Sequence, residues 1–270
     1  MKIMKLSIVA ALTAGAVLAL PVVPSIAADI YVPPVYEAPV PVPQFGGWYL
    51  RGHVGMSNQR YDGLDYRYFG TNSPGFTQSW LDEGGFGSAP IFGGGFGYAF
   101  NDWLRADATA EYRGKASFSA LDIFTEDATG DVFSSNDYTA QKSEILLLAN
   151  AYADLGNFGG VSPYVGAGIG ASRNTISHFN DTNVIQGGGG FAPSNSQWEL
   201  AWALHAGLGY AVTDQLTLDF GYSYTHLGDG KTGTARNYDP DPTATRENDG
   251  FTFKDLHSHD LKLGFRYKFN

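Results

Sequence analysis

The sequence of 270 residues contains no cysteine and is short of basic residues. Without cysteine the chain cannot form disulfides, iron–sulfur clusters or thiolate zinc sites. Lys and Arg together number 17 against 27 Asp and Glu, which gives a net charge of −10. Because an acidic protein is repelled by the phosphate backbone, we expect no nucleic acid among its partners.

No apolar run in the sequence is long enough for a membrane-spanning helix, which needs about 20 residues. The longest one, from Leu6 to Leu20, follows two lysines and is followed by the small residues Ala27 and Ala28. A basic start, a short apolar stretch and small residues at the end are typical of a secretory signal peptide. We expect residues 1–27 to be this peptide, with cleavage after Ala27 favoured over cleavage after Ala28.

Residues 28–45 are rich in proline, at positions 33, 34, 39, 41 and 43. Proline at this density blocks both helix and sheet, and it favours the extended polyproline II conformation. The sequence therefore predicts a semi-rigid periplasmic tether over residues 28–45, ahead of a single domain over residues 46–270.

Long helices are not expected in residues 46–270, because the chain has 35 glycines and a period of two runs through this region. In the first segment, Trp48 and Leu50 face one side, and Tyr49 and Arg51 face the other. Such alternation is typical of β-strands. It recurs in eight segments: GWYLRGHVGM, PIFGGGFGYAF, WLRADATAEYR, SEILLLANAYADL, VSPYVGAGIGAS, WELAWALHAGLGYAV, QLTLDFGYSYTH and HDLKLGFRYKFN.

The connections between these segments alternate between long and short. The long ones cover residues 57–89, 114–142, 173–197 and 227–258, and the short ones lie at 101–102, 156–160 and 213–214. This pattern predicts an all-β, eight-stranded antiparallel barrel in up-and-down order, with four long external loops and short periplasmic turns. Both ends of the chain then lie on the side of the short turns.

Volume decides which face of the predicted barrel points inward. A closed eight-stranded barrel has an interior just wide enough for its side chains, so the bulky Trp, Tyr, Phe and Leu set does not fit there. These side chains must point outward, and an outward apolar belt needs lipid around it. Closure also leaves no unpaired strand edge in the hydrocarbon. The sequence therefore predicts a transmembrane β-barrel.

The same alternation places eight charged side chains inside the barrel. Buried charges persist only when they are paired, so we expect an ion-pair and hydrogen-bond network that plugs the lumen. Its members are Arg51, Arg105, Asp107, Glu111, Asp219, Asp260, Lys262 and Arg266.

The histidines and serines do not form a recognisable catalytic or metal-binding pattern. His257 and His259 share one side of a strand, but we interpret them as polar residues at the mouth of the barrel rather than as metal ligands. His205 is expected to be a hydrogen-bonded filler of the lumen. His257-Ser258 is an adjacent His/Ser pair, but its members face opposite sides of a strand. We therefore expect no enzyme, no catalytic residues, no cofactor and no metal.

The AADIYVPP stretch at the predicted cleavage site, the GGWYLRGHVG first strand and the GFRYKF ending together resemble a known group. They are similar to the small outer-membrane β-barrel porin-family proteins and surface antigens of alphaproteobacteria, and the resemblance covers nearly the whole chain. It implies a location in the outer membrane of a Gram-negative cell envelope. It also implies insertion by the barrel-assembly machinery, with Tyr267 and Phe269 as the signal, although Asn270 follows where the family ends on the aromatic residue.

In some members of this group the mature N-terminus is joined to peptidoglycan. In this sequence the attachment point would be the amino group of Ala28, followed by Asp29. We expect a structural protein that helps to maintain envelope integrity, with lipids, lipopolysaccharide and peptidoglycan as partners. A narrow porin for small solutes and a surface adhesin or antigen that acts through its loops are the alternatives. The sequence does not indicate an oligomeric state.

Overall fold

The structure is a computed structural model that describes residues 46–66, 74–238 and 250–269. These residues belong to one compact unit, Gln44–Asn270. The predicted signal peptide (1–27) and tether (28–45), with Ala28 and Asp29, lie outside the described residues. Within the described ranges, no helix has the length and apolar character needed to cross a membrane.

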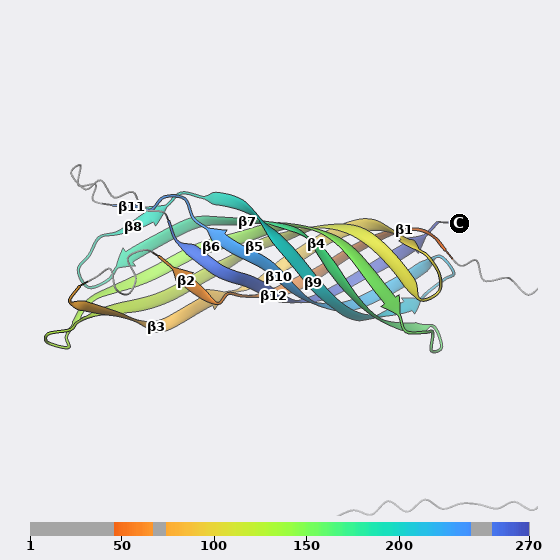
Figure 1. Ribbon diagram of the computed structural model, residues 1–270, viewed down its shortest axis with the longest axis horizontal. Coiled ribbons are helices and arrows are strands. Elements are labelled where there is room, and N and C mark those ends of the chain that lie inside the picture. The colour runs from red at the N-terminus through yellow and green to blue at the C-terminus, as the bar shows by residue number, and fades with distance from the viewer. Residues whose placement is uncertain (1–45, 67–73, 239–249, 270) are drawn as a thin grey trace, which may run out of the picture. The chain divides into compact units, whose positions relative to one another are not determined.

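The described chain consists of strands, and every pair of neighbouring strands is antiparallel. This confirms the predicted antiparallel all-β class. The twelve strands (Figure 1) are β1 (Gly47–Arg60), β2 (Gly63–Asp65), β3 (Phe76–Phe86), β4 (Ser88–Ala99), β5 (Leu104–Glu126), β6 (Val132–Asp154), β7 (Val161–Asn183), β8 (Gly189–Ala192), β9 (Asn195–Ala211), β10 (Leu216–Lys231), β11 (Arg236–Asn237) and β12 (Thr252–Lys268).

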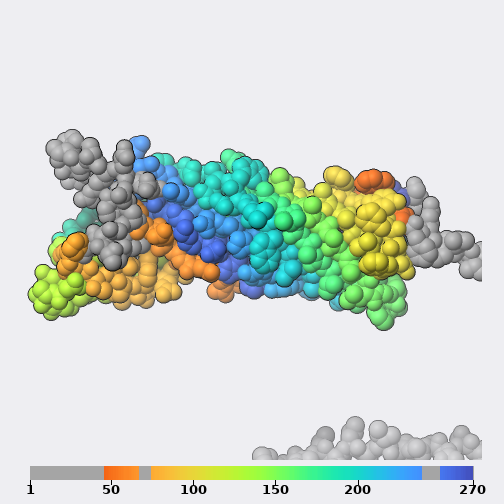
Figure 2. All heavy atoms as spheres, viewed as in Figure 1, coloured from red at the N-terminus to blue at the C-terminus, as the bar shows by residue number. Residues whose placement is uncertain are grey.

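Eight of these strands are paired on both sides, in an order that returns to its start. The order is β1, β4, β5, β6, β7, β9, β10, β12 and again β1. The other four strands, β2, β3, β8 and β11, attach to β12, β5, β7 and β8 respectively. The sequence predicted eight strands, and these four additional ones lie in segments that it assigned to connections. In Figure 2 the residues of β12, near the C-terminus and in dark blue, lie beside residues of β1 and β2, which come from the opposite end of the described chain and are drawn in orange.

The connections predicted as long external loops are largely strand instead. β5 continues to Glu126 and β6 begins at Val132, so only residues 127–131 join them. In the same way β7 continues to Asn183 and β9 begins at Asn195, with β8 between them. The ring of strands therefore has a short-turn end, where β1 begins and β12 ends, and an extended end, where these hairpins close.

A bulge in β5 explains why the sequence pattern hid this extension. Before the bulge the buried residues of β5 are odd-numbered, from Arg105 to Arg113; after it they are even-numbered, from Ala116 to Asp122. The pairing with β6 shifts register between Arg113 and Ala116. One extra residue moves every later side chain to the other face of the sheet. The bulky Phe118 therefore points inward, opposite to the bulky residues of the first half.

Before the bulge, the faces follow the predicted alternation. Trp48, Leu50 and Val54 are exposed, and Tyr49 and His53 are buried on the enclosed face of the ring. Glycines on this face leave room for rings. A Cβ atom at Gly97 would lie 2.4 Å from Tyr49 Cζ, and one at Gly166 would lie 2.4 Å from Tyr152 Cδ1.

The exposed face of the ring carries a continuous apolar belt. It is built from exposed side chains of the paired strands: Trp48, Leu50, Val54, Met56, Phe92, Phe96, Tyr112, Ile145, Leu147, Val165, Ile169, Trp198, Leu200, Leu204, Leu208, Tyr210, Leu218, Phe220, Tyr222, Leu261, Leu263, Phe265 and Tyr267. So large an apolar surface is incompatible with water. A closed ring of strands surrounded by lipid satisfies both the side chains and the backbone.

Candidate functional site

The candidate site is the enclosed face of the ring, where charged side chains meet. Its densest part surrounds Arg113, which is 0% exposed. The Arg113 guanidinium donates to Asp260 Oδ2 at 2.6 Å and to Glu111 Oε2 at 3.1 Å. It also donates to the Ser258 hydroxyl at 2.8 Å. Asp260 belongs to β12, three strands away from β5 in the ring order, so Arg113 links two strands that are not neighbours.

Lys262 and His53 complete this group around Glu111. The Lys262 ammonium lies 2.5 Å from Glu111 Oε1 and 4.0 Å from Asp260 Oδ2. His53 Nε2 lies 3.0 Å from the same Glu111 oxygen. Two carboxylates therefore share Arg113, Lys262 and the imidazole, so neither acid is buried without an opposite charge.

Toward the short-turn end, a second group centres on Asp107. Arg51 Nη1 donates to Asp107 Oδ2 and to the Tyr152 hydroxyl, both at 2.8 Å. Asn150 donates from Nδ2 to Asp107 Oδ1 at 2.8 Å, and its Oδ1 accepts a hydrogen bond from His205 Nε2 at 3.0 Å. His205 is thus a hydrogen-bonded residue of the enclosed face, as the sequence predicted.

Two further ion pairs lie at the short-turn end. Arg266 donates from Nε to Asp219 Oδ2 at 2.8 Å and from Nη2 to Asp219 Oδ1 at 2.9 Å. Arg105 Nε donates to both oxygens of Asp154, at 3.1 and 3.2 Å. The Arg105 guanidinium also lies over the Tyr152 ring, 4.0 Å from its centre, which adds a cation–π contact.

All eight residues that the sequence assigned to the enclosed network take part in ion pairs. Four pairs join predicted members with each other: Arg51 with Asp107, Lys262 with Glu111, Lys262 with Asp260, and Arg266 with Asp219. Arg105 pairs with Asp154, and Asp260 pairs more closely with Arg113; the sequence analysis left Asp154 and Arg113 out of the network. The buried pair Lys142 and Glu144 was also missed. Arg113 has the same parity as Arg105 and Glu111, so the alternation contained the signal for it.

At the short-turn end, Asp154 and Arg266 line a hollow of about 330 Å³. Little space remains between the charged groups beyond it. The cavity lined by Arg51, Glu111, Asp219 and Lys262, together with Tyr152, Tyr164 and Ser223, measures about 20 Å³. A water molecule needs roughly 10–15 Å³ of such space, so the cavity has room for about one.

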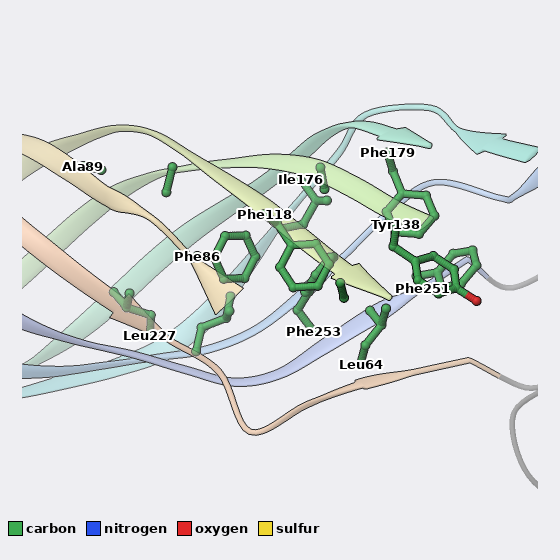
Figure 3. Close-up of a cluster of buried hydrophobic side chains, with 14 of the residues drawn as sticks. Leu64, Phe86, Ala89, Phe118, Tyr138, Ile176, Phe179, Leu227, Phe251 and Phe253 are labelled. Carbon is green, nitrogen blue, oxygen red and sulfur yellow. The ribbon is translucent and has the colours of Figure 1, made fainter. Parts of the chain in front are cut away.

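At the extended end an aromatic cluster fills the enclosed face. Phe86, Phe118 and Phe253 are buried with ring centres 4.9–5.2 Å apart (Figure 3). Phe179 stacks on Phe251 at 4.2 Å, and the Tyr138 ring lies 5.9 Å from the Phe251 ring. These side chains come from β3, β5, β6, β7 and β12 and the segment before it. The enclosed face is therefore apolar at this end and ionic along the belt.

Two carboxyl groups lie at the edge of the aromatic cluster. Asp122 accepts hydrogen bonds from Gln78 at 3.1 Å, Asn136 at 3.0 Å and the Tyr138 hydroxyl at 3.2 Å. Burial raises the pKa of Asp122, and burial together with the charge of Asp122 raises the pKa of Asp181 to about 7. Burial therefore favours the protonated form of both carboxyl groups.

The predicted insertion signal lies at the end of β12, on the exposed face. The Tyr267 hydroxyl donates to Gln215 Oε1 at 3.3 Å, and its ring centre is 5.9 Å from that of Phe269. The Phe269 N–H donates to the Trp48 carbonyl oxygen at 2.9 Å. The two aromatic residues are thus held beside the first strand.

Among the described residues, the histidines do not form a metal site with the acidic residues. In the described part of the chain, no three His, Asp or Glu side chains converge in a way that could hold a metal ion. His257 and His259 lie on the exposed face of β12, where their ring centres are 6.5 Å apart.

Comparison with known proteins gives one consistent family. A family model described as an outer membrane protein beta-barrel domain matches residues 16–269. An uncharacterized protein of Brucella suis biovar 1 is 31% identical over 90% of this chain and 92% of its own length. The outer membrane protein PagN of Salmonella typhimurium is 29% identical over 66% of this chain and 73% of its own length.

The solved structures similar to this one include a surface protein and an outer membrane protein. Neisserial surface protein A is 18% identical, with a TM-score of 0.43, over 83% of this chain and 97% of its own. OprG from Pseudomonas aeruginosa is 13% identical, with a TM-score of 0.43, over 83% of this chain and 97% of its own.

Proposed function

Because this chain belongs to the outer membrane protein β-barrel family, we propose that it is a structural, solute-tight barrel that helps to maintain the integrity of the envelope. The protein is located in the outer membrane, in contact with its lipids. In this proposal the eight strands that pair in a ring are the membrane-spanning strands, and the apolar belt faces the acyl chains. The extended end faces outward, and the short-turn end faces the periplasm.

The filled enclosed face is the observation that supports a structural role over a channel. Along the belt, ion pairs leave a cavity of only about 20 Å³, and the aromatic cluster fills the extended end. A continuous water path would need polar, open space through both regions. The side chains form two successive obstacles of different chemistry, so loosening one of them would leave the other in place.

We expect the folded protein to give no steady open-pore current in planar lipid bilayers. A known channel-forming barrel, inserted from the same detergent, is the positive control for the bilayer. Heat-dependent migration on gels establishes that the inserted protein is folded. Large, steady currents from the folded monomer would contradict the proposal and support the narrow porin that the sequence also allows.

The proposal includes a covalent link between the mature N-terminus and peptidoglycan. The support is the resemblance of the AADIYVPP start to family members that carry such a link, with a proline-rich tether behind it. We expect mass spectrometry of digested sacculi to find a muropeptide on the amino group of Ala28. A variant with Asp29→Ala serves as the matched comparison, since it alters the residue that follows the attachment point. A consistently free Ala28 amine would remove the link but leave the barrel unaffected.

A further inference from the structure

A row of basic side chains crosses three strands at the edge of the apolar belt that lies toward the extended end. Arg60 of β1 lies directly opposite His257 of β12, and His257 lies directly opposite His226 of β10. His226 in turn faces Trp202 of β9. Residues directly opposite each other in a sheet have Cβ atoms about 4.5–5.5 Å apart, so these side chains form one continuous row.

Apolar rows lie directly below this basic row on the same strands. One step toward the short-turn end, His259 faces Tyr224; the next step pairs Leu261 with Tyr222, and the one after it Leu263 with Phe220. Leu261, Leu263, Tyr222 and Phe220 are exposed. The basic row therefore lies where acyl chains give way to headgroups, and the rows below it offer a surface for the chains.

Contacts with aromatic residues hold His226, a member of the row, and His259, which lies one step below it. His226 stacks on Trp202, with ring centres 5.6 Å apart and planes 9° apart. A ring in this position gains cation–π stabilisation when it is protonated. The Tyr222 hydroxyl lies 2.7 Å from His259 Nδ1. The row is thus partly ordered before any ligand binds.

The hydrogen bond of His257 determines what its free nitrogen can do. His257 Nδ1 lies 2.8 Å from the carbonyl oxygen of Asp255. A carbonyl oxygen only accepts, so Nδ1 carries the hydrogen, and Nε2 of the neutral ring is an acceptor. Nε2 can donate to an anion only after the ring takes up a proton.

Acidic side chains lie farther out than the row. His226 Nε2 is 3.6 Å from Asp255 Oδ1, and His257 Nδ1 is 3.9 Å from Asp62 Oδ1. Lys254 pairs with Asp229 at 3.3 Å. Charge changes outward from the belt, from apolar to basic to acidic. The charged and titratable groups around the row among the described residues are Arg60, Asp62, Asp65, Tyr222, Tyr224, His226, Asp229, Lys254, Asp255, His257 and His259.

We propose that Arg60, His257 and His226 bind the phosphate group of a phosphorylated lipid in the outer leaflet, and that binding takes up protons on the two imidazoles. The lipid has its acyl chains against the exposed rows of β10 and β12. A protonated imidazole donates from both ring nitrogens and adds a positive charge, so binding strengthens as the pH falls. With neutral rings the row carries one positive charge, on Arg60; with both rings protonated it carries three. The inference rests on the proposed outward orientation of the extended end.

The test compares two lipids that differ in the phosphate alone. Full-length mature protein, folded in detergent micelles, is titrated into fluorescently labelled diphosphoryl lipid A or its dephosphorylated form, at pH 6 and at pH 8, and anisotropy reports binding. We expect a preference of about tenfold for the phosphorylated lipid at pH 6, and a smaller one at pH 8, because charge-assisted hydrogen bonds are lost with the phosphate. A triple variant, Arg60→Gln with His226→Gln and His257→Gln, is expected to lose this preference.

The matched control changes two other exposed basic residues, Lys115→Gln and Arg173→Gln, on β5 and β7. It is expected to keep the preference and its dependence on pH. Equal binding of the two lipids by the unaltered protein would overturn the proposal, as would an equal loss in the control. Heat-dependent gel migration excludes unfolded variants. Conductance does not enter this measurement, so its outcome is separate from that of the solute-tight barrel.

Discussion

Replacing Arg113 with alanine is expected to lower the free energy of unfolding by about 3–5 kcal/mol, because buried Asp260 then loses its main partner and buried Glu111 loses one of its partners. Arg113 is fully buried and bonds to both Asp260 and Glu111. Lys262 would be left as the nearest cation for both acids. Denaturant-induced unfolding in lipid vesicles, followed by tryptophan fluorescence, measures the difference.

Two further variants show that the loss comes from unpaired charge. Lys115→Ala, two residues along the same strand but exposed, is expected to change the free energy by less than about 1 kcal/mol. Adding Asp260→Asn to Arg113→Ala is expected to recover part of the loss, because one uncompensated charge is removed. If the double variant were less stable than Arg113→Ala by the full effect of a second independent loss, the shared network would not be the cause.

Replacing Leu263 with arginine is expected to destabilise the lipid-embedded protein by about 2–4 kcal/mol, the cost of a cation on the lipid face near the bilayer midplane. Leu263 lies opposite Phe220 and Val54, in the middle of the belt. The same unfolding measurement in vesicles reports the effect.

The control is the same substitution at a leucine outside the belt. Leu81, on β3 at the extended end, is 62% exposed, and Leu263 is 61% exposed. In water the two substitutions would have similar effects, so any difference reports the surrounding medium. Leu81→Arg is expected to change the free energy by no more than about 0.5 kcal/mol. Equal effects at the two sites would contradict the assignment of the belt to lipid.

The faces of the strands could be predicted from the sequence, whereas most charge partners could not. Each of Arg51, Asp107 and Lys262 is assigned to the enclosed face by its immediate neighbours alone, because strand alternation has a period of two. Whether Asp107 meets Arg51 depends on the register between strands 56 residues apart, which no local pattern contains. The partner of Asp260, Arg113, lies 147 residues away.

The extended end could not be predicted, because the rule that identified the strands reverses there. Bulky residues face outward where lipid surrounds the ring and inward where water does. Phe118 and Phe253 are buried, so they do not follow the alternation in which bulky residues face outward. The sequence analysis therefore placed them in loops. Lys142 and Glu144 were missed for a related reason, since they precede a stretch, Ile145–Leu148, that is apolar on both faces.

The bulge between Arg113 and Ala116 lets β5 turn its bulky side chains outward where lipid surrounds it and inward where water does, although its side chains alternate along both halves. Loss of a single residue at Gly114 would turn every side chain beyond it over, so that Phe118 met water and Ser117 met the interior. This position therefore separates two opposite arrangements of bulky and small side chains. Insertions here in related chains should contain an even number of residues, so that the side chains beyond them keep their faces.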